Sequence, residues 1–141
     1  MSPSGSDDLC LSIHLWFDGQ CEAAFGFYQR LLGGELTTML KYGDSPLADT
    51  VEPRWRERIL HATLRLGEQE LLGADVMPKD YARPQGFYAL LSLRGLAETR
   101  RVFDALAEGG TIQMPLQKTF WSEGFGVVTD RFGVPWEITS H

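Results

Sequence analysis

Residues 10–34 read Cys10-Leu-Ser-Ile-His-Leu-Trp-Phe-Asp-Gly-Gln-Cys-Glu-Ala-Ala-Phe-Gly-Phe-Tyr-Gln-Arg-Leu-Leu-Gly-Gly34. The first eight residues alternate like a half-buried strand, and one face carries Leu11, Ile13, Leu15 and Phe17. After a turn at residues 18–20, apolar side chains recur at helical spacing over residues 21–32: Ala24, Phe27, Tyr28, Leu31 and Leu32. Gly33-Gly34 is a typical helix end. The pattern predicts a strand, a turn and a helix in succession.

The same succession recurs in the second half of the chain. A strand is expected at residues 87–93 and a helix at residues 96–108, ended by Gly109-Gly110. Phe27 and Phe103 each lie six residues before the first glycine of their pair. Further strands are expected at 35–42, 59–66 and 70–76, and again at 111–116, 125–130 and 134–139. The chain therefore predicts two βαβββ modules, at about residues 10–78 and 86–140.

Length and composition place limits on the class of protein. A chain of 141 residues fits one domain, expected at 10–141 after a disordered lead-in at residues 1–9 that has no signal-peptide pattern. The net charge is −6, and the densest basic stretch, residues 54–58, is interrupted by a Trp and a Glu. This disfavours nucleic-acid binding. No apolar run reaches the roughly 18–20 residues that span a bilayer. Cys10 and Cys21 are expected to be reduced thiols in a cytoplasmic protein.

Two histidines and one carboxylate fall on strand faces that are expected to point away from the helices. His14 and Trp16 lie opposite the apolar row of the first strand, and His61 and Arg65 lie opposite the apolar row of residues 60–66. Glu137 likewise lies opposite the apolar row of the last strand. Two imidazoles and a carboxylate suit Zn, Fe, Mn or Ni with open positions for substrate. A hydrogen-bonded His14–Glu137 pair in a partly wet cavity explains the same residues without a metal.

Three further side chains are candidates for ligand binding. Trp16 and Trp121 are suited to wall a pocket for an apolar or planar ligand. Arg65 either holds an anionic ligand or pairs with an acidic side chain.

Cys21 starts a helix, where the dipole can lower a thiol pKa, but a buried structural thiol is the favoured interpretation.

Three segments carry a family resemblance: residues 17–35, residues 61–78, and the most specific one, Pro115-Leu-Gln-Lys-Thr-Phe-Trp-Ser-Glu-Gly-Phe-Gly-Val-Val-Thr-Asp-Arg-Phe-Gly-Val-Pro-Trp136. Together they resemble the PhnB-like branch of the glyoxalase/bleomycin-resistance superfamily, also called the vicinal oxygen chelate fold, over residues 11–139. The resemblance implies an α+β fold. In it, two βαβββ modules form a cupped, barrel-like mixed sheet with the helices outside, usually in a homodimer.

The superfamily's enzymes, which include glyoxalase I, fosfomycin-modifying proteins and extradiol dioxygenases, bind a divalent metal through inward strand residues. Carried over to this chain, His14 matches the first-strand histidine and Glu137 the last-strand glutamate. The second-module histidine position falls on Phe87, and the remaining position falls near residues 71–73. Two of four ligand positions are thus matched. His61 or Asp75 is the possible additional ligand.

The resemblance leaves two functions open. In the first, the cup between the modules binds a small molecule, lined by Trp16, His61, Arg65, Phe87 and Trp121. In the second, the protein is a glyoxalase-, dioxygenase- or fosfomycin-transferase-like enzyme whose divalent metal acts as a Lewis acid on vicinal substrate oxygens. Relatives in this branch also carry the description 3-demethylubiquinone methyltransferase. The sequence shows neither a glycine-rich methyl-donor loop nor a Rossmann pattern to match that description.

Overall fold

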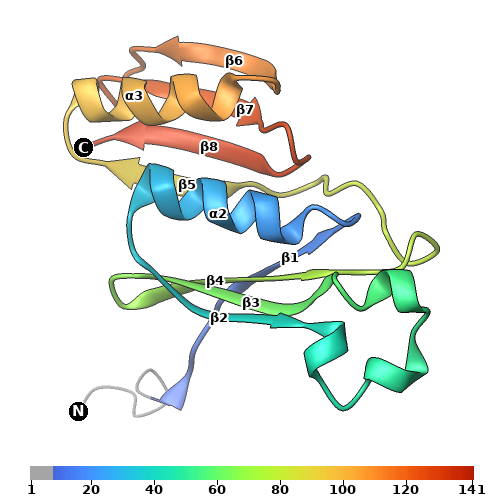
Figure 1. Ribbon diagram of the computed structural model, residues 1–141. Coiled ribbons are helices and arrows are strands. Elements are labelled where there is room, and N and C mark those ends of the chain that lie inside the picture. Colours follow the sequence, from blue (N-terminus) through green and yellow to red (C-terminus); the bar gives the residue numbers. More distant parts are fainter. Residues whose placement is uncertain (1–7) are drawn as a thin grey trace. The chain divides into compact units, whose positions relative to one another are not determined.

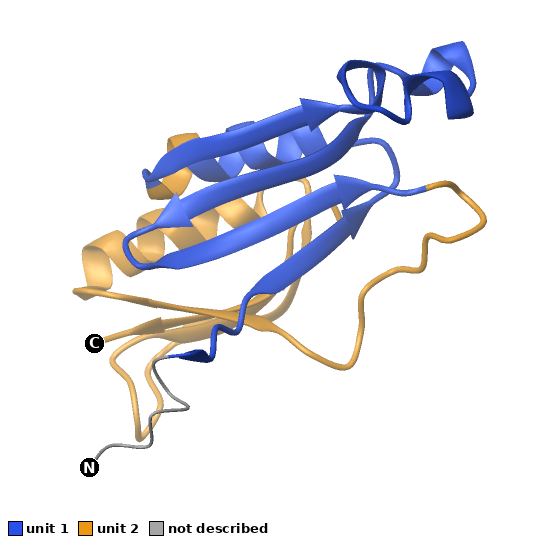
Figure 2. Cartoon of the chain, turned by 90° about the horizontal axis from the view of Figure 1, so that it is seen from below, with its two compact units in different colours: residues 1–29, 33–76 blue, residues 30–32, 77–141 orange. Residues whose placement is uncertain are grey.

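The computed structural model describes residues 8–141 (Figure 1), so most of the expected lead-in, residues 1–7, lies outside the described residues. The chain divides into two compact units (Figure 2). Unit 1 holds residues 1–29 and 33–76, and unit 2 holds residues 30–32 and 77–141. No helix within residues 8–141 is both long and apolar enough to cross a membrane.

The two units repeat one topology. The sheet of unit 1 has the order β1-β4-β3-β2, built from β1 (Ile13–Phe17), β4 (Gln69–Asp75), β3 (Ile59–Leu66) and β2 (Glu35–Lys41). The sheet of unit 2 has the order β5-β8-β7-β6, built from β5 (Ala89–Leu93), β8 (Pro135–Ser140), β7 (Phe125–Thr129) and β6 (Thr111–Gln117). In each sheet the first pair is parallel and the others are antiparallel. The predicted βαβββ repeat is therefore confirmed.

Each module carries one helix after its first strand, α2 (Cys21–Leu32) and α3 (Leu96–Ala107). α3 buries Val102, Phe103 and Leu106 as predicted. In α2 the fully buried rings are Phe25 and Tyr28, whereas Phe27, which the spacing paired with Phe103, is half-buried. Phe25 lies over Gly73 of β4, where any Cβ would collide with the ring. This close approach sets which face of α2 meets the sheet, and helical spacing alone did not resolve it.

The second glycine of each helix-ending pair lies against a strand of its own module. Gly33 and Gly34 both have positive φ, +81° and +84°. A Cβ on Gly34 would collide with the carbonyl oxygen of Arg65 on β3, and one on Gly110 with that of Thr129 on β7. Glycine at these positions therefore serves the chain reversal and also the close packing of backbone on backbone.

Two strands start later than the sequence predicts. β1 begins at Ile13 rather than at residue 10, and Leu11 is 94% exposed. Its parallel partner β4 begins only at Gln69, with Ile13 paired to Leu71, so little ladder remains for earlier residues. β5 begins at Ala89 rather than at residue 87.

The long loop after β2 is packed rather than open. Three short 3-10 turns, Tyr42–Asp44, Ala48–Thr50 and Pro53–Trp55, cross it. Trp55 is buried and meets the Tyr42 ring edge-on at 5.8 Å. The Tyr42 hydroxyl donates to the backbone oxygen of Asp75 over 3.0 Å. The loop is thereby tied to the end of β4.

Candidate functional site

The face of the first sheet that turns away from its core carries the first candidate residues. On β1, Leu15 and Phe17 are buried, while His14 and Trp16 alternate with them and Trp16 is 49% exposed. Trp16 pairs in register with Ala74 of β4. On the other edge of β4, Ala62 of β3 pairs with Gly73. This register places His61 of β3 beside Ala74. The strand register therefore puts Trp16, Ala74 and His61 in one row across the sheet.

The two histidines of this face are in contact. The ring centroids of His14 and His61 lie 6.0 Å apart at an interplanar angle of 83°. The His61 Nε2 atom and the Thr63 hydroxyl share a hydrogen bond of 3.2 Å. Burial lowers the pKa of His14, repulsion from His61 lowers it further, and a hydrogen bond with the Gly73 backbone opposes both. His14 is therefore a neutral imidazole at neutral pH, able to accept a hydrogen bond or to ligate a metal.

Arg65 lies on the same face but at the other end of the sheet. It pairs with Glu70 of β4, both in strand register and as an ion pair of 3.9 Å. Trp16 pairs four residues further along β4, which corresponds to about 13 Å. Arg65 lines a separate cavity of about 490 Å³ with residues 10–12 and 67–70. The structure thus shows the acid-paired alternative for Arg65 and does not bring it beside Trp16.

Asp75 occupies the opposite face, toward α2. The residue is 1% exposed. One carboxylate oxygen accepts from the Cys21 amide at 3.0 Å and the other from the Ile59 amide at 2.9 Å. These bonds join the start of α2, the start of β3 and the end of β4. Asp75 therefore holds the fold of unit 1 together and is not presented to a ligand beside His14.

The Cys21 thiol at the start of α2 is not activated. Burial raises its pKa, and the negative charges of Asp75 and Glu22 raise it further. These effects outweigh the positive end of the helix dipole. Cys21 and the exposed Cys10 are both free thiols. The favoured interpretation of Cys21 as a buried structural thiol agrees with this environment.

Glu137 occupies in unit 2 a position like that of Leu72 in unit 1. It is half-buried on β8, between Leu90 of β5 and Val127 of β7. In unit 1 the parallel pair places His14 beside Leu72. Each parallel pair thus offers one potential metal donor and one leucine.

Phe87 is not the counterpart of His14. It lies two residues before β5, exposed, at a small cavity of about 190 Å³ that residues 83–88 help to line. The position beside Glu137 is held by Leu90. β5 starts two residues later than the sequence pattern indicated, so Phe87 lies outside the strand.

The donors that unit 1 offers to a divalent metal are two imidazoles. The two rings lie 6.0 Å apart, and the hydrogen bond with the Thr63 hydroxyl orients the His61 ring. Imidazole suits Zn and Ni, and ring orientation by a second hydrogen bond is usual for metal-bound histidine. Within residues 8–141 no three His, Cys, Asp or Glu side chains gather into a group suited to hold a metal ion. The structure thus brings together two of the predicted donors.

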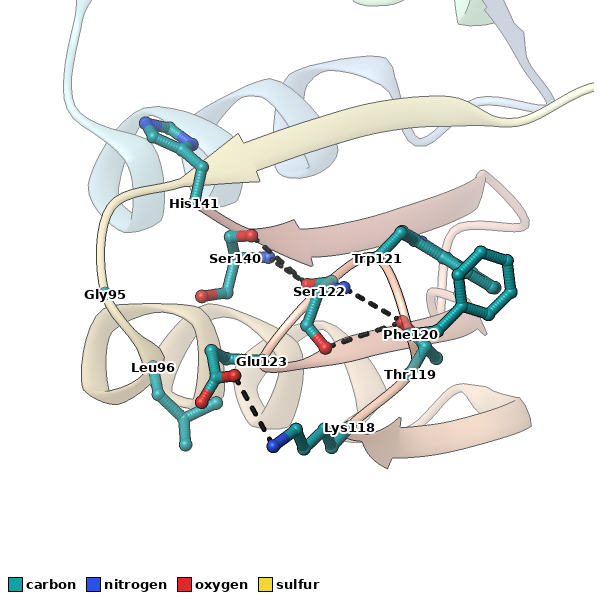
Figure 3. A pocket seen from close by; sticks show the side chains of 10 residues that line it. All are labelled: Gly95, Leu96, Lys118, Thr119, Phe120, Trp121, Ser122, Glu123, Ser140 and His141. Carbon is teal, nitrogen blue, oxygen red and sulfur yellow. Dashed lines mark hydrogen bonds and ion pairs between the residues drawn. The ribbon is translucent and has the colours of Figure 1, made fainter.

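Trp121 lies in unit 2, in the loop between β6 and β7. The side chain is 57% exposed and lines a cavity of about 580 Å³ together with residues 118–123, 95–96 and 140–141 (Figure 3). The C-terminal residue His141 takes part in structure there. Its backbone amide donates a hydrogen bond to the Leu93 carbonyl oxygen, and its carbonyl oxygen accepts one from the Gly95 amide. Its Nδ1 atom lies 2.6 Å from the Ser92 hydroxyl. The sequence pattern indicates Trp121 but not the surrounding cavity, because the lining residues come from three separate segments.

Comparison with known proteins identifies the family. A family model described as 3-demethylubiquinone-9 3-methyltransferase matches residues 10–139. The chain belongs to this PhnB-like family. Protein YjdN of Escherichia coli (strain K12) is 40% identical over 136 residues, covering 91% of this chain and 92% of that protein.

Solved structures agree with this assignment. Protein PA1353 from Pseudomonas aeruginosa is 41% identical, with a TM-score of 0.84 over 94% of this chain and 98% of its own. A putative 3-demethylubiquinone-9 3-methyltransferase, PhnB protein, from Bacillus cereus is 28% identical, with a TM-score of 0.80 over 93% and 98%. A glyoxalase-related enzyme from Fulvimarina pelagi shares the fold at 17% identity, with a TM-score of 0.57 over 93% and 87%. The PhnB-like protein thus has the glyoxalase/bleomycin-resistance fold.

Proposed function

We propose that this PhnB-like protein binds a small molecule on the face of its first sheet that carries His14, Trp16 and His61. The observation that carries the proposal is the edge-to-face contact of the two imidazoles at 6.0 Å. Neither ring is part of the apolar core of unit 1, and the half-exposed Trp16 lies in the same row as His61. Polar rings beside an indole on a non-core sheet face are typical of a ligand site.

The side chains supply complementary interactions. A neutral His14 offers one donor and one acceptor, because burial and His61 lower its pKa. Trp16 offers an apolar ring face for stacking. Thr63 holds the His61 ring through its hydroxyl, so that the ring is oriented before a ligand arrives. The face therefore suits a molecule with a flat apolar part and at least one hydrogen-bonding oxygen or nitrogen.

A second candidate function is divalent-metal-dependent catalysis on a substrate with vicinal oxygens. The observation that favours it is the 6.0 Å contact of the His14 and His61 imidazoles, with the His61 ring oriented by its hydrogen bond with Thr63 as is usual for metal-bound histidine. The family resemblance adds Glu137. A bound Zn, Ni, Mn or Fe ion would supply Lewis-acid polarisation of the substrate oxygens. Methyl transfer is not proposed, since the two four-stranded mixed sheets differ from the doubly wound parallel sheet of dinucleotide-type sites.

Fragment screening by two-dimensional NMR tests the first proposal. We expect hits to shift the backbone signals of residues 14–16 and 61–63 saturably, and His61→Gln to weaken the strongest hit roughly tenfold. The matched control is His141→Gln, an exposed histidine in unit 2, which should leave that affinity unchanged. Hits that leave both segments unshifted, or that bind the His61→Gln variant equally well, would contradict the proposal.

Metal analysis separates the two functions. Protein purified without an affinity tag is exposed to Zn, Ni, Mn or Fe, dialysed and analysed for bound metal. Stoichiometric metal that is lost in His14→Ala would support the enzyme and contradict binding without a metal. Failure to retain any of the four metals would contradict the enzyme.

The remaining expectations concern assembly and location. The family resemblance favours a homodimer, and the exposed Leu90 and Ile112 on the edge strands of the second sheet support it. Two free cysteines and an acidic composition support a cytoplasmic protein that does not bind nucleic acid.

A further inference from the structure

The loop between β6 and β7 is held firmly in place. We call residues 118–124 the aromatic loop. The Ser122 hydroxyl donates to the Gly124 backbone oxygen at 2.8 Å and accepts from the Gly124 amide at 3.1 Å and the Thr139 hydroxyl at 3.0 Å. The Thr119 amide donates to the Ser122 backbone oxygen at 2.9 Å, and the Ser140 amide to that of Gly124 at 2.9 Å. The loop is thus bonded to itself and to β8, so the cavity that it borders is preformed.

Two exposed rings form a corner at this cavity. Phe120 is 97% exposed, and its ring meets that of Trp121 at 4.7 Å and an interplanar angle of 83°. The Trp121 ring also contacts that of Phe125, at 5.3 Å. A flat ring that stacks on one side of such a corner meets the other ring edge-on, and aromatic pairs favour both geometries. Adjacent exposed aromatic rings beside a cavity can provide an apolar surface for a ligand.

A polar pair borders the same cavity. The Lys118 Nζ atom lies 3.8 Å from a Glu123 carboxylate oxygen, and the two side chains are 75% and 73% exposed. Figure 3 shows the two rings to the right of Ser122 and this pair below it. Such an exposed pair is weak, so Lys118 can turn to another carboxylate at little cost. Gly95 and Leu96, at the positive end of α3, also line the cavity.

We propose that this cavity binds a flat aromatic carboxylate, with the ring in the Phe120–Trp121 corner and the carboxylate on Lys118. The cavity volume of about 580 Å³ lies within the range of small-molecule sites. The residues involved all belong to unit 2. The inference therefore does not depend on the proposed function of the His14–His61 face.

Titration of the full chain with 2-naphthoate, followed by two-dimensional NMR, tests the assignment. We expect saturable shifts of the signals of residues 119–123 and of the Trp121 indole, with a Kd of about 1 mM or tighter. Trp121→Ala should weaken binding roughly tenfold or more, because the stacking surface is lost. Phe120→Ala, at a nearly fully exposed position, should also weaken binding and serves if Trp121→Ala fails to fold.

Removing the charge of Lys118 and removing that of Glu123 should change the affinity for 2-naphthoate in opposite directions. Lys118→Gln should weaken 2-naphthoate binding about threefold to tenfold, whereas Glu123→Gln should strengthen it, since Lys118 then has no competing carboxylate. The exposed-surface control Leu47→Ala should leave the affinity unchanged. Three results would each overturn the proposal: shifts outside the aromatic loop only, equal binding by Trp121→Ala, or tighter binding of the cationic 2-naphthylmethylammonium than of 2-naphthoate.

Discussion

Asp75 shows how a single buried carboxylate can join three elements of unit 1. Its two carboxylate oxygens accept hydrogen bonds from the backbone amides of Cys21 and Ile59, which lie at the starts of α2 and β3. In Asp75→Asn one acceptor becomes an NH₂ group that faces a backbone amide. We expect the substitution to lower the free energy of unfolding by about 2–3 kcal/mol in urea denaturation, because a buried donor is left unsatisfied.

Asp49→Asn is the matched control for Asp75→Asn. The Asp49 side chain is fully exposed and only loosely paired with Arg56 at 3.9 Å. Its substitution should change the free energy of unfolding by no more than about 0.5 kcal/mol. Equal effects at the two positions would show that the Asp75 hydrogen bonds do not stabilise unit 1.

His14 should make the stability depend on pH. Its pKa is lowered in the folded state by burial and by His61, from an unfolded value of 6.5. Between the lowered pKa and 6.5 the unfolded state binds more protons, so stability is full above 6.5 and falls as the pH drops through this window. With EDTA present, the wild type should lose more stability than His14→Asn between about pH 7.5 and about pH 5.

The contribution of His61 can be measured separately. His61→Gln removes the second cause of the lowered pKa of His14. NMR titration of the His14 ring protons should therefore show a higher pKa in this variant than in the wild type. An unchanged pKa would contradict the contact between the two imidazoles.

At the scale of elements, the two glycines that end α2 provide a matched pair. Both have positive φ, but a Cβ on Gly33 meets open space, whereas one on Gly34 collides with the Arg65 carbonyl oxygen of β3. We expect Gly33→Ala to cost about 1 kcal/mol of backbone strain, and Gly34→Ala to cost about 1–3 kcal/mol more. Thermal unfolding of both variants measures the difference. Equal losses would mean that backbone conformation alone requires the glycine pair.

The sequence predicted the interior of the elements better than their ends. Alternation placed Leu15 and Phe17 in the core and His14 on the other face, because residue parity within a strand is a local property. The start of β1 depends on where β4 begins, which is a property of distant residues. The start of β5 depends in the same way on its pairing with β8, which begins at Ala89 rather than at Phe87.

For the whole molecule, the sequence predicted the repeat and part of the candidate site. Parity and resemblance placed His14 and His61 on one face, and the structure brings their rings together. The role of Asp75 was not predictable, since it depends on α2, β3 and β4 meeting at one point. Arg65 was predicted on the correct face, but the strand register places it beside Glu70 and far from Trp16.

Assembly can be tested directly on the whole molecule. Sedimentation equilibrium should give about twice the mass of one 15.8 kDa chain if two copies associate. Leu90→Glu, on an exposed edge strand of the second sheet, should shift the equilibrium toward the single chain. A mass of one chain across the micromolar range would contradict the homodimer.

A crystal structure of the protein with its tightest-binding fragment examines ligand binding at atomic detail. The proposed function predicts that the fragment lies on the face of the first sheet, with a polar atom within hydrogen-bond distance of His14 or His61 and its flat part against Trp16. Density for the fragment only in the cavity beside the aromatic loop, or elsewhere on the molecule, would contradict the assignment of the His14–His61 face as the ligand site.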